Sequence, residues 1–240
     1  MGVTERTVQH DFYVYVDVVL MTIEDGVLKV LTVQRATAAP GMRALPGGLV
    51  EPGEDLPEAA SRELQEETGL RVSPASLRQI GAYGHPLRDT RYGRAISVAY
   101  LAMIPSPRAV RAGSDAARAE FITYRQARGR GFLEFDHRDI VGDARRLASR
   151  ELEDTPIALE FCRNEFTMSE LRHVYEAFYQ RELDPANFRR KVEDVIGFVE
   201  PLDYVATDRP APGRPPRLYK KGRAKRLVLP VHFRRVDDRD

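Results

Sequence analysis

The sequence predicts a mixed α/β domain followed by a smaller domain of helices and strands. Three observations carry this prediction. The first half holds β-branched and aromatic runs separated by turn residues, with two helix-like stretches among them, and the second half changes to a helix, turn, helix, strand, loop, strand order. The chain of 240 residues is long enough for two domains of ordinary size.

The first two strands are expected at 12–23 and 27–35. Both runs are rich in valine, and Asp25-Gly26 between them is a dipeptide that favours a two-residue hairpin turn. Another strand is expected from Ala95 to Ile104, because Pro105 then ends the run.

Two helices are expected among these strands. The first spans 56–68, with Pro57 near its start and Gly69 just past its end. The second follows Asp136, which is expected to be its N-cap, and continues to Arg150. The first domain is therefore expected to comprise residues 1–152.

The remaining residues, 153–240, are expected to form a winged helix-turn-helix. Thr167 and Glu170 make a capping-box pattern before one helix, and Asp184-Pro185 supplies an N-cap and a first-turn proline for the next. Two strands joined by a Pro/Gly-rich basic loop follow, as the wing of such a domain requires. The apolar face expected to be buried on the second helix consists of Phe188, Val192, Val195 and Ile196.

Composition excludes several classes of protein. The formal net charge is +1, so bulk charge favours neither nucleic acid nor a membrane as partner. A single cysteine, Cys162, excludes a disulfide framework, and this thiol is expected to be inert. The sequence shows no apolar run near the ~18 residues of a spanning helix, and its start lacks a signal-peptide pattern. We expect a cytoplasmic protein with no membrane partner.

The strongest chemical signal is the stretch GLVEPGEDLPEAASRELQEETGL at 48–70. Its three glutamates, Glu63, Glu66 and Glu67, are spaced i, i+3 and i+4, so their carboxylates share one face of the helix. Adjacent carboxylates repel one another unless a cation neutralises them, and Mg²⁺ or Mn²⁺ suits oxygen ligands. A solvated acidic face is the alternative interpretation.

This spacing is the complete Nudix box, and residues 10–150 resemble the Nudix superfamily. The resemblance implies an α/β/α sandwich and Mg²⁺-assisted hydrolysis of nucleoside diphosphates linked to another group. Arg62 is expected to form an ion pair with Glu54. One of the three glutamates of the box, or an acid outside it such as Glu120, could orient the attacking water. The resemblance implies catalytic roles for Arg62, Glu63, Glu66 and Glu67, and metal ligation by Glu63, Glu66, Glu67 and the Gly48 backbone.

The ligand-binding residues are less sharply indicated. Several arginines before and after the box are candidates, because arginine can hold phosphate with two hydrogen bonds. Each of them is individually more typical of an ordinary surface residue. Arg88 lies in one loop with Arg91 and Arg94, before the strand expected at 95–104. Phe132, Phe135 and His137 could stack on a base or belong to the core. The candidates for ligand binding are Arg35, Arg43, Gly47, Gly48, Arg91 and Arg94.

The second helix of the C-terminal domain is the expected DNA-reading element. With its apolar face buried, Asn187 and Arg190 point outward, and Arg189 and Lys191 flank them. Asn and Arg side chains read adenine and guanine with two hydrogen bonds. Residues 209–226 hold eight Lys or Arg and no acid, and should contact phosphates. A charged surface helix with a basic linker is the alternative. The candidate wing contacts are Arg214, Arg217, Lys220 and Lys221.

The box followed by FTMSELRHVYEAF, LDPANFRRKV, GFVEPL and GRPPRLYK resembles the NrtR family of Nudix-related regulators of NAD metabolism. The resemblance implies a homodimeric repressor that binds palindromic operator DNA upstream of NAD metabolism genes and is released by ADP-ribose or a related nucleotide. Sugar-sensing Nudix regulators share this architecture. The alternative function is a Mg²⁺-dependent ADP-ribose pyrophosphatase with a C-terminal interaction domain, and the intact box leaves hydrolysis open.

Overall fold

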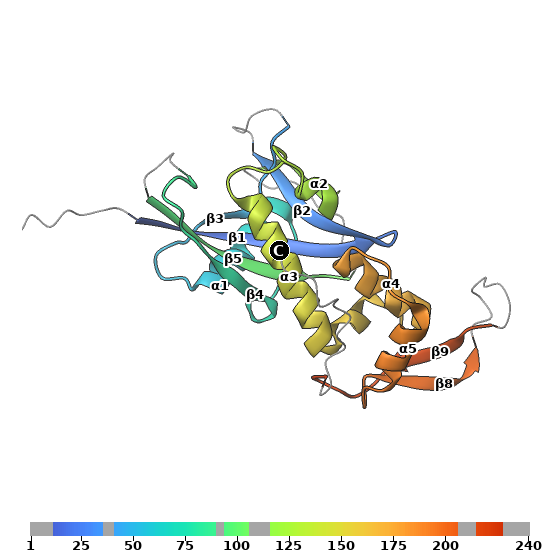
Figure 1. The fold of residues 1–240 in the computed structure, drawn as a ribbon. Helices are drawn as coiled ribbons and strands as arrows, with labels where there is room; N and C mark the ends of the chain where they lie inside the picture. The colour runs from blue at the N-terminus through green and yellow to red at the C-terminus, as the bar shows by residue number, and fades with distance from the viewer. Residues whose placement is uncertain (1–11, 36–40, 90–93, 106–115, 206–214, 228–240) are drawn as a thin grey trace, which may run out of the picture. The chain divides into compact units, whose positions relative to one another are not determined.

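The computed structural model describes residues 12–35, 41–89, 94–105, 116–205 and 215–227 (Figure 1). The chain divides into two compact units. The first comprises residues 1–20, 30–102 and 108–144, and the second comprises 21–29, 103–107 and 145–240. In the described part of the chain, every helix is too short or too polar to cross a membrane.

A six-stranded sheet forms the centre of the first half of the chain (Figure 1). Its strand order is β4-β5-β1-β2-β6, and the short β3 pairs antiparallel with β1. Neither β4 nor β6 was anticipated from the sequence. The strands are β1 (Phe12–Glu24), β2 (Val27–Arg35), β3 (Gly47–Leu49), β4 (Arg78–Tyr83), β5 (Arg94–Met103) and β6 (Ala116–Thr123).

The predicted hairpin between β1 and β2 is confirmed. Asp25 and Gly26 have φ values of 51° and 74°, so both turn residues adopt the left-handed conformation that a type I′ turn requires. The predicted strand at 95–104 is also confirmed, displaced by one residue at each end. β1 and β5 are buried along most of their length, so they form the central part of the sheet's core.

The helices of this half are α1 (Leu56–Thr68), α2 (Tyr124–Ala127) and α3 (His137–Asp154), with a short 3₁₀ turn at Pro74–Ser76. The predicted bounds of α1 are confirmed. Asp55 and Glu58 close a capping box at its start. The helix expected to end at Arg150 continues four residues further, and the two compact units divide within it, between residues 144 and 145.

The second unit contains the expected winged helix. A 3₁₀ segment at Pro156–Phe161 precedes β7 (Glu165–Thr167), α4 (Met168–Tyr179), α5 (Pro185–Glu193), β8 (Val199–Val205) and β9 (Arg217–Lys221). The three strands pair in the order β7-β9-β8, and β7 was not foreseen. Both predicted caps are present: Thr167 and Glu170 form the capping box of α4, and Asp184 accepts from the backbone N–H of Asn187.

One residue of the predicted apolar face is not buried. Phe188, Val192 and Val195 lie in the core, but Ile196 is 91% exposed, so its predicted burial was wrong. The reason is that α5 ends at Glu193, and the helical repeat that would have turned Ile196 inward stops before it.

Candidate functional site

Arg62 of α1 joins this helix to the preceding glycine loop, residues 47–54. Its Nε and Nη2 donate to the two carboxylate oxygens of Glu54 at 3.0 and 2.7 Å, and Nη2 also donates to the backbone oxygen of Leu49 at 3.1 Å. The predicted ion pair with Glu54 is therefore confirmed, with bidentate geometry. The hydrogen bonds that Arg62 donates to Glu54 lower the pKa of Glu54 and raise the pKa of Arg62.

The same guanidinium also contacts the acidic face of α1. Its Nη1 donates to Oε1 of Glu63 at 2.8 Å and to Oε2 of Glu66 at 3.2 Å. The pKa of Glu63 is nevertheless raised. Burial, together with the neighbouring negative charge of Glu66, outweighs the attraction of Arg62. An additional cation at this face would relieve that unfavourable environment.

Gly47 and Gly48 bring the loop into close contact with these carboxylates. The N–H of Gly47 donates to Oε2 of Glu67 at 3.0 Å, and Glu67 is buried. A Cβ atom at Gly48 would lie 2.5 Å from Oε2 of Glu63 and closer still to the rest of its carboxylate. A larger residue at this position would require the carboxylate of Glu63 to move from its present place.

The donors at this face suit a hard divalent cation. Three carboxylates and a loop backbone are the oxygen-rich ligands that such ions prefer. Within the described ranges, no three His, Cys, Asp or Glu side chains converge on one point that could hold a metal ion. Glu63 and Glu66 face Arg62 and Glu67 faces Gly47, so a cation would compete with these two partners.

A buried polar network lies beside Gly47, and sequence reasoning did not find it. Asp17 pairs with Gly47 in the register of β1 and β3, and its carboxylate accepts from Ser97 at 2.5 Å and from Arg88 at 3.2 Å. Burial would raise the pKa of Asp17, but His137, Ser97 and Arg88 outweigh burial and hold that pKa below its usual range. Asp17 therefore remains ionised inside the domain.

His137 connects this network to the loop. Its Nδ1 accepts from the backbone N–H of Leu45 at 2.9 Å, and its Nε2 lies 3.4 Å from Oδ1 of Asp17. His137 is 1% exposed, so it belongs to the core and is not available to stack on a ligand. Asp136 precedes α3 as expected, although its carboxylate binds Arg88 at 2.7 and 3.0 Å.

The ligand-binding candidates differ in their surroundings. Arg43 forms an ion pair with Glu120, its guanidinium lies 5.9 Å from the ring centre of Phe132, and its buried Nη1 has no hydrogen-bond partner among the described residues. Arg94 donates to the backbone oxygen of Gly84 at 2.8 Å. Arg91 lies outside the described residues, and for Arg35 only its place at the end of β2 is described.

Arg88, by contrast, is not a surface arginine. Its side chain is 4% exposed and bridges Asp17 and Asp136. The hydrogen bonds and charges of these two carboxylates outweigh burial and raise its pKa. The arginine-rich sequence of its loop indicated a surface role, and only the fold shows that Arg88 is an internal counter-ion.

The exposed face of α5 carries three of the four residues expected to read DNA. Asn187, Arg189 and Arg190 are exposed, whereas Lys191 is half-buried. Arg190 donates to Oδ1 of Asn187 at 3.0 Å and lies 3.6 Å from Asp194.

The wing carries the remaining candidates. Nε of Arg217 donates to the backbone oxygen of Leu202 at 3.4 Å, and Lys220 lies 3.2 Å from Glu200 on the neighbouring strand. Lys221 forms an ion pair with Glu160. Arg214 lies outside the described residues. The lone Cys162 is partly buried, and burial raises the pKa of its thiol to about 12, as expected for an inert cysteine.

Comparison with known proteins identifies both halves. Residues 13–143 match the NUDIX domain, and residues 158–220 match the NrtR DNA-binding winged helix domain. An ADPR responsive transcriptional repressor, NtrR, of Acinetobacter baylyi is 30% identical over 201 residues, which are 82% of this chain and 78% of that protein. The chain belongs to the NrtR family. The expected Nudix fold with a C-terminal winged helix is thereby confirmed.

An ADP-ribose pyrophosphatase and a MutT/nudix family protein also resemble this NrtR-family protein. An ADP-ribose pyrophosphatase of Methanocaldococcus jannaschii is 39% identical over 127 residues, which are 51% of this chain and 71% of that enzyme. Among solved structures, a MutT/nudix family protein from Enterococcus faecalis has a TM-score of 0.71 at 26% identity, with 91% of this chain and 89% of that chain covered.

Two solved structures of Shewanella oneidensis NrtR carry ligands. NrtR complexed with a 27mer DNA has a TM-score of 0.65 at 26% identity and covers 90% of this chain and 98% of that chain. Its NUDIX domain complexed with ADP ribose has a TM-score of 0.53 at 28% identity and covers 60% of this chain and 94% of that chain.

Proposed function

We propose that this protein is a transcriptional repressor whose NUDIX domain binds ADP-ribose and whose winged helix binds operator DNA upstream of NAD metabolism genes. The observation that carries the proposal is the presence of a NUDIX domain and an NrtR winged helix in one chain, which is 30% identical to an ADPR responsive repressor over 82% of its length. We assign residues 1–152 to ligand binding and 153–240 to DNA binding. A protein that acts on the chromosome is expected in the cytoplasm.

For DNA binding, the proposal uses the exposed face of α5 and the wing. Asn187 and Arg190 form a hydrogen-bonded pair at the solvent-facing side of α5, so they can enter a major groove together. The cations of the wing would hold phosphates, which orient the domain without reading sequence. A homodimer would place two copies of α5 on a palindrome with half-sites one or two helical turns apart.

For ligand binding, the proposal uses the glycine loop and Arg43. The buried Nη1 of Arg43 lacks a partner among the described residues, and an unsatisfied buried donor beside an aromatic ring suits a phosphate with an attached nucleoside. Mg²⁺ or Mn²⁺ at Glu63, Glu66 and Glu67, with the Gly48 backbone, would neutralise the pyrophosphate of ADP-ribose. Arg35, Arg91, Arg94 and Gly47 remain further candidates for contacts with the ligand.

A second candidate function is hydrolysis of ADP-ribose, and the intact box favours it. Arg62 holds Glu54, Glu63 and Glu66 in a single hydrogen-bonded group, which is the arrangement that positions carboxylates for catalysis. A bound divalent cation would lower the pKa of the attacking water. Glu120 is a weaker candidate for the general base, since Arg43 and Arg118 both form ion pairs with it.

The decisive experiment is a titration of DNA from upstream of the protein's own gene, with and without ADP-ribose. It is performed in metal-free buffer and with the Glu66→Gln/Glu67→Gln variant, after ligand binding has been verified, so that the ligand is not consumed. We expect ADP-ribose to weaken DNA binding roughly 5- to 150-fold, and DNA to weaken ADP-ribose binding by the same factor. Equal DNA affinity in both titrations would refute ligand control and leave hydrolysis as the function of the NUDIX domain.

A further inference from the structure

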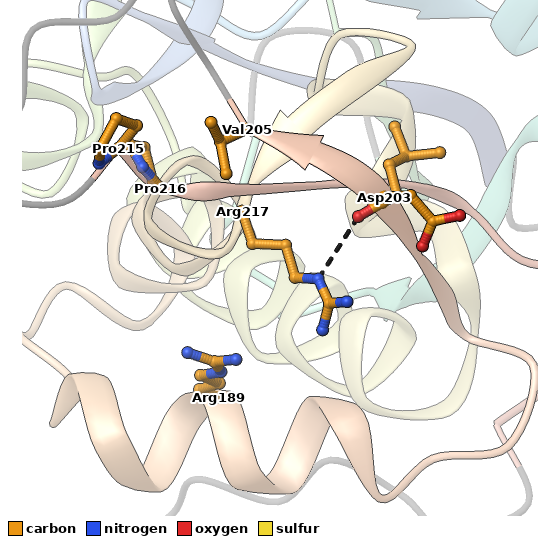
Figure 2. A pocket seen from close by; sticks show the side chains of 7 residues that line it. Arg189, Asp203, Val205, Pro215, Pro216 and Arg217 are labelled. Atoms are coloured by element: carbon orange, nitrogen blue, oxygen red, sulfur yellow. Dashed lines mark hydrogen bonds between the residues drawn. The ribbon is translucent and has the colours of Figure 1, made fainter.

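A cleft of about 540 Å³ lies within the second unit, between α5 and the wing strands β8 and β9 (Figure 2). Arg189 extends into it from α5 and Arg217 from β9, and Leu202 and Val205 supply apolar walls. Figure 2 shows the two guanidinium groups pointing into the same space. Asp203 also lines the cleft, so its two guanidinium groups outnumber its one carboxylate, and the net positive charge suits an anion.

Arg189 is held in place by a shared acceptor. Its Nε donates to Oε1 of Glu193, one helical turn away, at 2.9 Å. An exposed ion pair of this kind would by itself fix the side chain only weakly. Here the hydroxyl of Tyr219 donates to the same oxygen of Glu193 at 2.6 Å, so a residue of β9 fixes the acceptor that orients Arg189.

Tyr219 is well suited to act as the fixed end of this chain of hydrogen bonds. It is 2% exposed, it pairs with Phe166 in the register of β7 and β9, and the two rings stack with centres 6.5 Å apart. Burial and the carboxylate of Glu193 raise the pKa of Tyr219, so its hydroxyl stays protonated and donates. Burial opposes ionisation of Glu193, but Tyr219 and Arg189 outweigh it and lower the pKa of Glu193.

Arg190, next along the helix, provides the contrast. Its partners are Asn187 and Asp194, and both are exposed residues of the same helix or its C-cap. Within the described part of the chain, neither partner is hydrogen-bonded to the wing. Arg190 therefore keeps more rotamer freedom than Arg189, which is compatible with reading a base but not with a preformed phosphate site.

We propose that Glu193 and Tyr219 are positioning residues that hold Arg189 toward the cleft, so that α5 and the wing present one preformed site for a phosphate of the DNA backbone. The proposal rests on the proposed DNA-binding function. Its physical basis is preorganisation: a side chain that is already ordered loses less entropy when DNA binds. The sequence could not have indicated this, because Tyr219 and Glu193 are distant in the chain and each is an ordinary residue for its element.

The test is the variant Tyr219→Phe, which deletes one hydroxyl and keeps the ring against Phe166. The control is Tyr175→Phe, which deletes a buried hydroxyl that donates to the backbone oxygen of Leu152 at 2.9 Å. We measure affinity for the upstream duplex and for an unrelated duplex of equal length, with thermal unfolding to verify folding. Tyr219→Phe should bind both duplexes roughly 2- to 12-fold more weakly, because a phosphate contact is sequence-independent, and Tyr175→Phe should bind them normally.

A double-mutant cycle separates positioning from a structural role. In the Arg189→Ala background, Tyr219→Phe should change DNA affinity less than 2-fold, because the residue through which it acts is gone. An equal loss in both backgrounds, or no loss in the wild-type background, would overturn the inference. If Arg189→Ala alone binds DNA normally, the inference also fails while the proposed function stands. Failure of the wild-type protein to bind any duplex would instead overturn the proposed function.

Discussion

Two adjacent glycines should respond differently to the same methyl group. In Gly48→Ala, the added Cβ would lie 2.5 Å from Oε2 of Glu63 and nearer to its Cδ and Oε1, so the Glu63 carboxylate must rotate away. The chain can tolerate this, because the displaced atoms are the end of a flexible side chain. In Gly47→Ala, the Cβ would overlap the backbone oxygen of Val16 and lie 3.0 Å from Cα of Asp17, and the backbone of β1 cannot rotate away.

The expected magnitudes follow from these contacts. Gly48→Ala loses one partly exposed bond between Glu63 and Arg62, worth up to about 1 kcal/mol, and gains about 0.4–1 kcal/mol from the stiffer unfolded chain. Its melting temperature should therefore change by less than about 3 °C. Gly47→Ala overpacks backbone at a cost of about 1–3 kcal/mol, which lowers the melting temperature by roughly 2–12 °C.

The assay combines thermal unfolding with a titration of Mn²⁺ that is monitored by calorimetry. Gly48→Ala should remain folded and bind Mn²⁺ about 10- to 100-fold more weakly, because Glu63 no longer occupies its place beside the loop. Gly47→Ala should be the destabilised variant. If Gly48→Ala melts as low as Gly47→Ala, or retains its Mn²⁺ affinity, the close approach of Glu63 to the loop is not what places this carboxylate.

The remaining predictions concern the box, the DNA surface and the buried network. Glu66→Gln/Glu67→Gln should lower Mn²⁺ affinity and any ADP-ribose hydrolysis together, hydrolysis by at least ~100-fold; unchanged turnover in a coupled phosphate assay would contradict the catalytic assignment. Arg190→Ala should lose about 1–3 kcal/mol of discrimination between operator and unrelated DNA, whereas Lys220→Ala should weaken both and flatten the salt dependence in a mobility shift. Asp17→Asn should lower the free energy of unfolding by about 3 kcal/mol at pH 7. This is the low end for breaking a buried pair, because Arg88 keeps the carboxylate of Asp136 as a partner. Since the pKa of Asp17 is lowered by folding, this difference is full above about pH 4 and shrinks below it; a constant difference in melting temperature from pH 7 to pH 3 would contradict the buried charge.

The sequence by itself determined the local structure. The bounds of α1, the hairpin turn at Asp25-Gly26 and both caps of the winged helix follow from residues within a few positions of each other, so a linear pattern contains them. The spacing of the box also placed the carboxylates of α1 on one face and anticipated the pair between Arg62 and Glu54. Burial of Ile196 was misjudged because the helical period was extended past the end of α5.

Only the tertiary structure decided which polar residues meet across the chain. Asp17 lies 71 residues from Arg88 and 120 residues from His137, and nothing in either neighbourhood of the sequence marks them as partners. Likewise Tyr219 reaches Glu193 across 26 residues, through the pairing of β9 with the strands beside it. Such contacts depend on strand order and register, which are set by the packing of the whole domain and not by local propensity. For that reason the sequence identified the box, while the fold alone revealed the buried network beside its loop and the hydrogen bond that joins α5 to β9.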